Sequence, residues 1–191
     1  KYLEKSIQSI FSQEYKNWEI IFVDNSSEDN SYSILKKFDN LKINYFYLKN
    51  KISLYEARNY ALKKCKGDYI SFLDVDDYWL SNKISKQIDL INKKKFDVVY
   101  SNYYLKNYNF PYSKKIFCKS TLPSGHITNK LLENYSVGIL TLIFSKKKIL
   151  ETDKLSFNEN YDNISDFDFV LQCSLKNKIG VIQEPLAVYG R

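Results

Sequence analysis

The sequence predicts an α/β fold with a mostly parallel central sheet flanked by helices. Short apolar runs rich in β-branched and aromatic residues alternate with amphipathic segments of helical period. This alternation is typical of strands joined by crossover helices, which makes neighbouring strands parallel. Two of the apolar runs, 19–23 and 69–73, stop directly at an aspartate. Ligands of such sheets bind at the carboxyl ends of the strands, so these aspartates are candidate site residues.

The first half of the chain carries the more regular pattern. Apolar residues at helical spacing predict a helix over 2–13, and the run EIIFV predicts a strand over 19–23. Ser26 and Asp29 resemble a capping box, and Gly67 is expected at the C′ position of a helix. The remaining expected elements are strands at 43–48, 69–73 and 98–104, and helices that end at 38, cover 54–65 and cover 84–91.

The second half is less regular, and no linker separates it from the first. We expect one domain over 1–191, made of the halves 1–104 and 105–191. The elements expected after 104 are loop and strand over 110–123, a helix at 127–134, a strand at 140–144, a helix at 166–175, and short strands near 181 and 187–189.

Composition excludes several classes of protein. The longest apolar runs are of strand length, well below the roughly 20 residues of a membrane span. The three cysteines are far apart and lack CxxC spacing, which favours a reducing compartment and argues against a zinc site. His126 is the only histidine, so a catalytic triad is implausible. The net charge is +7, and many of the lysines occur in short runs, which we interpret as solvent-exposed faces of helices and loops. No nucleic-acid-binding motif accompanies these runs.

The strongest chemical signal is the acidic segment Asp74-Val75-Asp76-Asp77. Carboxylates this close repel one another, and a cation between them relieves the repulsion. Mg²⁺ and Mn²⁺ take one or two protein carboxylates and complete their shells with water and substrate phosphates. On spacing alone, a helix cap or a solvated acidic turn explains the segment equally well.

Four motifs resemble the family 2 inverting glycosyltransferases of the GT-A fold: FVDNSSEDNS (22–31), EARN (56–59), KGDYISFLDVDDYW (66–79) and SDFDF (165–169). The resemblance implies a Rossmann-like sheet with a smaller mixed half on the acceptor side. It assigns nucleotide-sugar binding to 1–104, and acceptor binding and the catalytic base to 105–191.

At matched positions the resemblance implies donor-binding roles. Asp24 and Asn25 are expected at the nucleotide base, and Arg58 beside the nucleotide or its phosphates. Asp76 is expected to bind the metal, Mn²⁺ or Mg²⁺. Asp74 is expected to lie at the ribose of the donor or to bind the same metal. Capping of the next turn by Asp24, and an exposed Arg58 that pairs with nearby glutamates, stay open as structural alternatives.

Asp166 matches the catalytic base of the family, which removes the proton of the acceptor hydroxyl. Asp168 is the alternative base. A purely structural alternative is a capping box of Ser165 and Asp168.

The sequence departs from the family pattern at three places. Asn25 stands where a second Asp is usual, Ser26 where Gly is usual, and Ser165 where Glu is usual. The first strand of the family is missing beside 19–23, which would leave a sheet edge open, so we expect the natural protein to continue upstream.

The resemblance therefore implies transfer of a hexose or N-acetylhexosamine from a UDP-sugar to a hydroxyl of a glycan or lipid-linked acceptor in surface polysaccharide or lipopolysaccharide synthesis. Such an enzyme is expected in the cytoplasm, with possible peripheral contact with an anionic membrane. A sugar nucleotidyltransferase and a non-catalytic UDP-sugar-binding module remain alternatives.

Overall fold

A computed structural model describes residues 2–38, 41–109 and 114–190 of the chain. Its helices are α1 (Leu3–Phe11), α2 (Ser31–Lys36), α3 (Leu54–Lys64), α4 (Lys83–Lys94), α5 (Thr128–Glu133) and α6 (Ser165–Lys176), with a 3-10 turn η1 (Ile139–Thr141) and a π-helical segment η2 (Lys147–Thr152). Its strands are β1 (Ile20–Asp24), β2 (Ile43–Tyr47), β3 (Tyr69–Ser71), β4 (Tyr78–Trp79), β5 (Val98–Lys106), β6 (Lys114–Ile116), β7 (Ile143–Ser145) and β8 (Ile179–Gly190). The predicted alternation of strands and helices is present.

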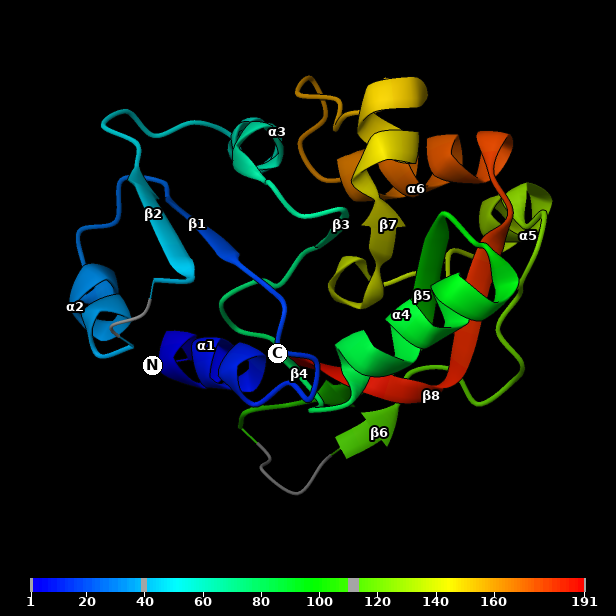
Figure 1. Ribbon diagram of the computed structural model, residues 1–191, viewed down its shortest axis with the longest axis horizontal. Helices are drawn as coiled ribbons and strands as arrows, with labels where there is room; N and C mark the ends of the chain where they lie inside the picture. Colours follow the sequence, from blue (N-terminus) through cyan, green and yellow to red (C-terminus); the bar gives the residue numbers. More distant parts are fainter. Residues whose placement is uncertain (1, 39–40, 110–113, 191) are drawn as a thin grey trace.

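The strands form two sheets, a parallel pair and a larger sheet of mixed direction. β1 and β2 form a parallel pair, and the larger sheet has the order β3-β7-β5-β8-β4, with β6 paired to β5 (Figure 1). In the larger sheet β5 and β8 pair in parallel, whereas its other described pairs are antiparallel. The sheet is therefore mixed rather than mostly parallel. One cause is the short connection from β5 to β6, which cannot supply the crossover that parallel strands require.

A cavity of about 570 Å³ separates the two sheets. Side chains of α1, β1, β3 and α4 line it, and most of them are apolar. Among the described residues, β1 pairs with β2 alone and β3 with β7 alone, so each has an edge without a strand partner. This agrees with the open edge expected beside 19–23.

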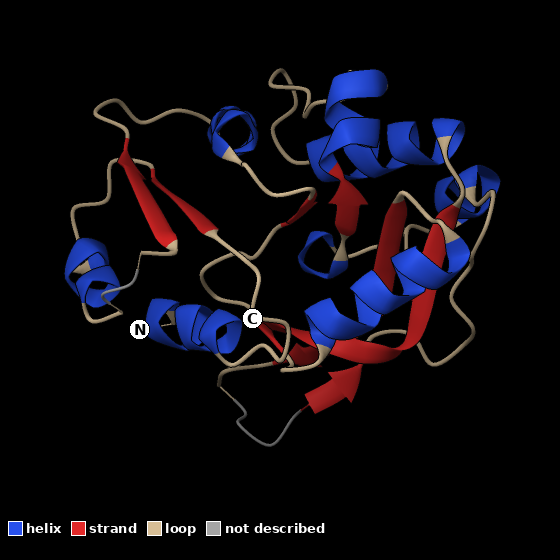
Figure 2. Cartoon of the chain, in the orientation of Figure 1, coloured by secondary structure: helices blue, strands red, loops and turns tan. Residues whose placement is uncertain are grey.

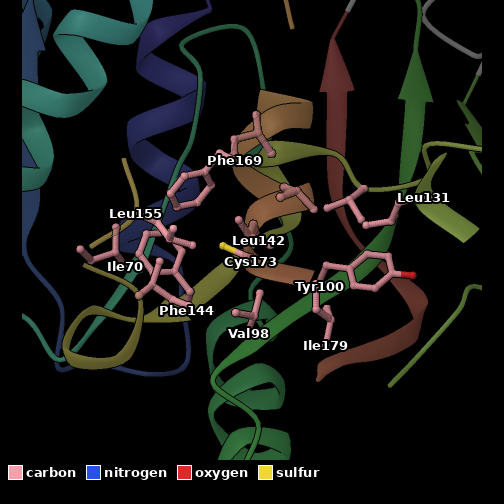
Figure 3. Packing of buried hydrophobic residues seen from close by; sticks show 14 of the residues in the cluster. Ile70, Val98, Tyr100, Leu131, Leu142, Phe144, Leu155, Phe169, Cys173 and Ile179 are labelled. Atoms are coloured by element: carbon pink, nitrogen blue, oxygen red, sulfur yellow. The ribbon is translucent and has the colours of Figure 1, made fainter. Parts of the chain in front are cut away.

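The main core surrounds β5. The first six residues of β5 are buried, and α4 lies across β5 and β8 (Figure 2). Apolar side chains of β5, β7, β8 and α6 pack together with no exposed surface (Figure 3), among them Val98, Phe144, Phe169, Cys173 and Ile179. Among the described residues, no helix combines the length and the apolar character needed to cross a membrane.

Several predicted boundaries were wrong. The strand expected at 69–73 ends at Ser71, and the one expected at 140–144 begins as η1 before β7. The two strands expected near the C-terminal end are one strand, β8. Residues 110–113 of the expected segment 110–123 lie outside the described residues, and β6 follows them.

Two predicted helix ends were also wrong. α3 ends at Lys64, and Cys65 is extended, so Gly67 is not a C′ residue. α2 has no side-chain cap; Asp29 instead accepts a hydrogen bond from the Ser31 amide at 2.9 Å. Ser26 cannot cap α2, because its left-handed backbone (φ 60°) turns the chain and its hydroxyl donates to the Leu48 carbonyl at 2.7 Å.

Candidate active site

The turn after β1 is fixed by its own polar side chains. Asp24 is 4% exposed; its Oδ1 accepts from the Ser27 amide at 2.8 Å and its Oδ2 from the Tyr45 hydroxyl at 2.7 Å. Asn25 donates to the Ile52 carbonyl at 2.7 Å and accepts from the Ile52 amide at 3.0 Å. The turn-capping alternative for Asp24 is thus present. Each carboxylate oxygen of Asp24 has a further lone pair, so Asp24 can still accept a hydrogen bond from an N–H group of a ligand.

Arg58 joins two carboxylates that are far apart in the sequence. It is 6% exposed, and its Nη2 donates to both carboxylate oxygens of Asp74 at 3.1 Å. Its Nη1 donates to Oδ1 of Asp166. An exposed Arg58 that pairs with Glu56 was the wrong alternative, because Glu56 instead completes a capping box with Ser53 at the start of α3.

Aromatic rings enclose the Arg58 guanidinium. The ring centroids of Tyr55, Phe72 and Phe157 lie 5.6–5.7 Å from its Cζ. Asn59 fixes the segment that carries one of these rings, since it donates to the Phe157 carbonyl at 2.9 Å and accepts from the Phe157 amide at 3.0 Å. The rings exclude water, which strengthens the ion pairs of Arg58 and holds its fork in one orientation.

Of the two base candidates on α6, only Asp166 contacts Arg58. Burial raises the pKa of Asp166, the charge of Asp74 raises it further, and Arg58 opposes both effects. Asp168 accepts a hydrogen bond from Gln172 of its own helix at 2.7 Å. The capping box of Ser165 and Asp168 is absent: α6 has no side-chain cap, and the buried Ser165 hydroxyl has no partner within the described residues.

The three carboxylates of the acidic segment after β3 lie in different environments. Asp74 faces Arg58 and keeps 40% of its side chain exposed. Asp76 is exposed, and its carbonyl accepts from the Tyr108 hydroxyl at 2.6 Å. Asp77 is 2% exposed, and its Oδ1 accepts from the Gly190 amide at 2.9 Å. Burial raises the pKa of Asp77 to about 7. Asp77 therefore anchors the turn to β8 and leaves Asp74 and Asp76 available for a ligand.

Asp74 and Asp76 fit a divalent cation that takes few protein ligands. Within the described residues no group of three or more His, Cys, Asp or Glu could hold a metal ion. Mg²⁺ and Mn²⁺ do not need such a group, because two carboxylates, water and substrate phosphates complete their shells. Arg58 and the carboxylates together form a cluster of opposite charges beyond the carboxyl end of β3, which is a candidate site for an anion and a cation.

Several residues that position the candidate site were not predicted from the sequence. The Ser53–Glu56 capping box and the Asn59 clamp flank Arg58, and each has a visible signal: the S-x-x-E spacing before α3, and the place of Asn59 in the EARN motif. Asp77, by contrast, is one of three adjacent acids, and its burial depends on β8, which is more than 100 residues away along the chain.

Comparisons with known proteins agree with this fold. The family model for glycosyl transferase family 2 matches residues 1–153. The chain is 34% identical over 144 residues to the *Escherichia coli* protein WfgD, a UDP-Glc:alpha-D-GlcNAc-diphosphoundecaprenol beta-1,3-glucosyltransferase; the match covers 75% of this chain and 55% of WfgD. It is 45% identical over 103 residues to WfaP of *Escherichia coli*, which carries the same activity name, over 53% of this chain and 40% of WfaP.

Solved structures show the same fold. The *S. aureus* protein TarS in complex with UDP superimposes with a TM-score of 0.83 at 20% identity, over 100% of this chain and 56% of that chain. The mannosyltransferase PcManGT from *Pyrobaculum calidifontis*, in complex with GDP-Man and Mn²⁺, gives a TM-score of 0.69 at 14% identity, over 98% of this chain and 52% of that chain.

The fold, with acidic residues at its strand ends, is that of a GT-A-like glycosyltransferase domain. The family match covers most of the sequence, and the four motifs lie in the expected order. The chain belongs to glycosyl transferase family 2. It spans about half the length of WfgD and of WfaP.

Proposed function

We propose that this chain is the catalytic domain of an inverting glycosyltransferase that moves a sugar from a UDP-sugar to a hydroxyl of a lipid-linked or glycan acceptor. The observation that carries the proposal is the contact of Arg58 with both Asp74 and Asp166. It joins a half-buried carboxylate of raised pKa to a residue that we assign to the donor diphosphate. The relatives WfgD and WfaP are named as glucosyltransferases that use UDP-Glc and a diphosphoundecaprenol-linked acceptor, which supports the donor and acceptor classes.

On the donor side, the turn after β1 holds the nucleotide base through Asp24 and Asn25. Asp74 and Asp76 would hold Mn²⁺ or Mg²⁺ at the donor diphosphate. The cation, when bound, neutralises the charge that develops on the departing diphosphate. Arg58 keeps Asp74 oriented and adds positive charge at the same place. Residues 1–104 carry this donor half.

On the acceptor side, Asp166 acts as the general base. The acceptor oxygen attacks the anomeric carbon from the face opposite the diphosphate, and its proton passes to the Asp166 carboxylate. A new C–O bond forms while the bond to the diphosphate breaks, and the electron pair of that bond leaves with UDP. Single displacement inverts the anomeric configuration. Asp166 is suited to this role because burial raises its pKa, which strengthens it as a base.

The donor assignment is tested by the thermal stability of the protein with UDP. We expect UDP to raise the Tm only when Mn²⁺ or Mg²⁺ is present, because a ligand that binds the folded state stabilises it by mass action. Asp76→Asn should lose this shift. Its free energy of unfolding should stay within about 0.5 kcal/mol of the wild type, since Asp76 is exposed. Asp29→Asn, on the exposed surface before α2, is the matched control and should keep the full shift.

A metal-independent UDP shift, or a full shift in Asp76→Asn, would contradict the donor assignment. The same samples separate the alternatives. Pyrophosphate release from UTP and a sugar phosphate would identify a nucleotidyltransferase, and UDP binding without any donor turnover would identify a binding module.

A further inference from the structure

Three lysines of different elements gather beside the acidic turn. Lys5 lies on α1, Lys106 ends β5, and Lys114 begins β6 (Figure 1). Lys106 and Lys114 stand directly opposite each other in the antiparallel pair of β5 and β6. Like charges in that position destabilise a sheet, so the arrangement calls for a compensating charge.

Aromatic rings hold the ammonium groups in place. The Lys5 Nζ lies 3.4 Å from the ring centroid of Tyr78, and the Lys114 Nζ lies 3.8 Å from that of Tyr104. The Lys106 Nζ lies 5.6 Å from the ring centroid of Tyr108. Cation–π contacts favour the ammonium form but do not neutralise its charge.

No carboxylate pairs with these lysines among the described residues. Partial burial, followed by the charges of Lys106 and Lys114, lowers the pKa of Lys5 to about 8. The pKa of Lys114 is lowered too, first by burial and then by Lys106. The three groups therefore repel one another, and an oxyanion between them would relieve the repulsion.

The cluster adjoins the candidate donor site. The Tyr108 hydroxyl donates to the Asp76 carbonyl at 2.6 Å, and Tyr78 follows Asp76 by two residues. The donor diphosphate is already served by Arg58 and by the carboxylates that hold a cation. A second phosphate-bearing group beside the candidate donor site would belong to the acceptor.

We propose that Lys5, Lys106 and Lys114 form an oxyanion site for a phosphate or diphosphate group on the acceptor. The proposal rests on the proposed glycosyl transfer and specifies the acceptor class. The site would hold the acceptor by its phosphate so that the attacking hydroxyl reaches the anomeric carbon, in keeping with the preference of ammonium groups for phosphate oxygens.

The test uses inorganic pyrophosphate as the probe in EDTA, measured by calorimetry on wild type, on a variant with Lys5→Gln, Lys106→Gln and Lys114→Gln, and on Lys115→Gln. Lys115 neighbours Lys114, but alternation along β6 turns its side chain to the other face. We expect the triple variant to bind pyrophosphate at least about tenfold more weakly, the effect of losing one or more charge-assisted hydrogen bonds. Lys115→Gln should bind as the wild type does. Equal affinity in all three proteins would overturn the proposal.

Two further readouts identify the source of the phosphate. With a diphosphate-linked acceptor, KM should rise about tenfold or more in the triple variant while metal-dependent donor hydrolysis stays unchanged. If donor hydrolysis is absent from the wild type, the proposed function itself fails, whatever the lysines bind. A third readout is sedimentation with phosphatidylglycerol–phosphatidylcholine vesicles. Loss of vesicle binding in the triple variant with pyrophosphate affinity intact would assign the lysines to a membrane surface and overturn the acceptor site.

Discussion

Arg58 and Lys83 are both buried cations, yet their surroundings differ completely. Arg58 binds two carboxylates and is enclosed by three rings. Lys83 is 0% exposed; it donates to the Ser71 hydroxyl at 2.9 Å and lies 4.2 Å from the centroid of the Trp79 ring. Among the described residues no carboxylate pairs with Lys83. Burial lowers the pKa of Lys83 to about 7, so much of its charge is lost near neutral pH.

These two residues represent two different roles of a buried cation. A cation with fixed carboxylates stays charged and positions them, which is useful to a reaction. A buried cation without carboxylate partners tends to lose its proton. Its side chain is then held by packing and by a hydrogen bond. The partners of a buried charge, rather than its burial, therefore mark the candidate site.

The largest effect is expected at Arg58. Arg58→Met leaves Asp74 and Asp166 without their cation; because both carboxylates are partly exposed, we expect a cost of about 1.5–3 kcal/mol, the range for losing a hydrogen bond to a charged group. We expect the free energy of unfolding in urea to fall by about that amount and transfer to be lost. Arg58→Lys, which keeps the charge but cannot fork between two carboxylates, should be less destabilised and still impaired. A stable and active Arg58→Met protein would remove the central role of this residue.

A smaller effect, dependent on pH, is expected at Lys83. The folded-state pKa of about 7 lies below the unfolded value of 10.5, so the unfolded chain binds more protons between these limits. The contribution of Lys83 to the free energy of unfolding of the wild type therefore increases as the pH rises from about 7 to 10.5, and it is lowest below about pH 7. Lys83→Met lacks this dependence, so its stability relative to wild type should be greatest near pH 7 and should decline by more than about 1 kcal/mol toward pH 10.

Urea unfolding at several pH values measures this difference directly. Lys93→Met, an exposed substitution on the same helix, should show no such trend. A constant difference between Lys83→Met and wild type across the range would mean that Lys83 keeps an ordinary pKa in the folded protein.

Many of the helices and strands could be predicted because local sequence patterns determine them. The apolar runs at β1 and β5 and the amphipathic spacing of α1 and α4 follow from periodicity. Strand direction in the larger sheet could not be predicted, since β7 and β8 join it from distant parts of the chain. The short strand β4 was missed because two residues have no detectable period.

The candidate site divides in the same way. Motif positions identified Asp24, Asn25, Arg58, Asp74, Asp76 and Asp166 as candidates. The contact between Arg58 and Asp166 could not be predicted from the sequence, because 108 residues separate them and only the tertiary fold brings them together. The choice between Asp166 and Asp168 also needed coordinates, since residues two apart on a helix point to different sides. Their roles in binding and catalysis remain predictions.

The proton-accepting role of Asp166 is tested most directly by comparing Asp166→Asn with Asp168→Asn in a transfer assay, with UDP affinity measured on the same samples. We predict that Asp166→Asn loses transfer by about 100-fold or more while its UDP affinity stays close to that of the wild type. Asp168→Asn should retain most of its activity, because its carboxylate bonds to Gln172 of its own helix. Turnover that persists in Asp166→Asn, or is lost in Asp168→Asn alone, would contradict the account.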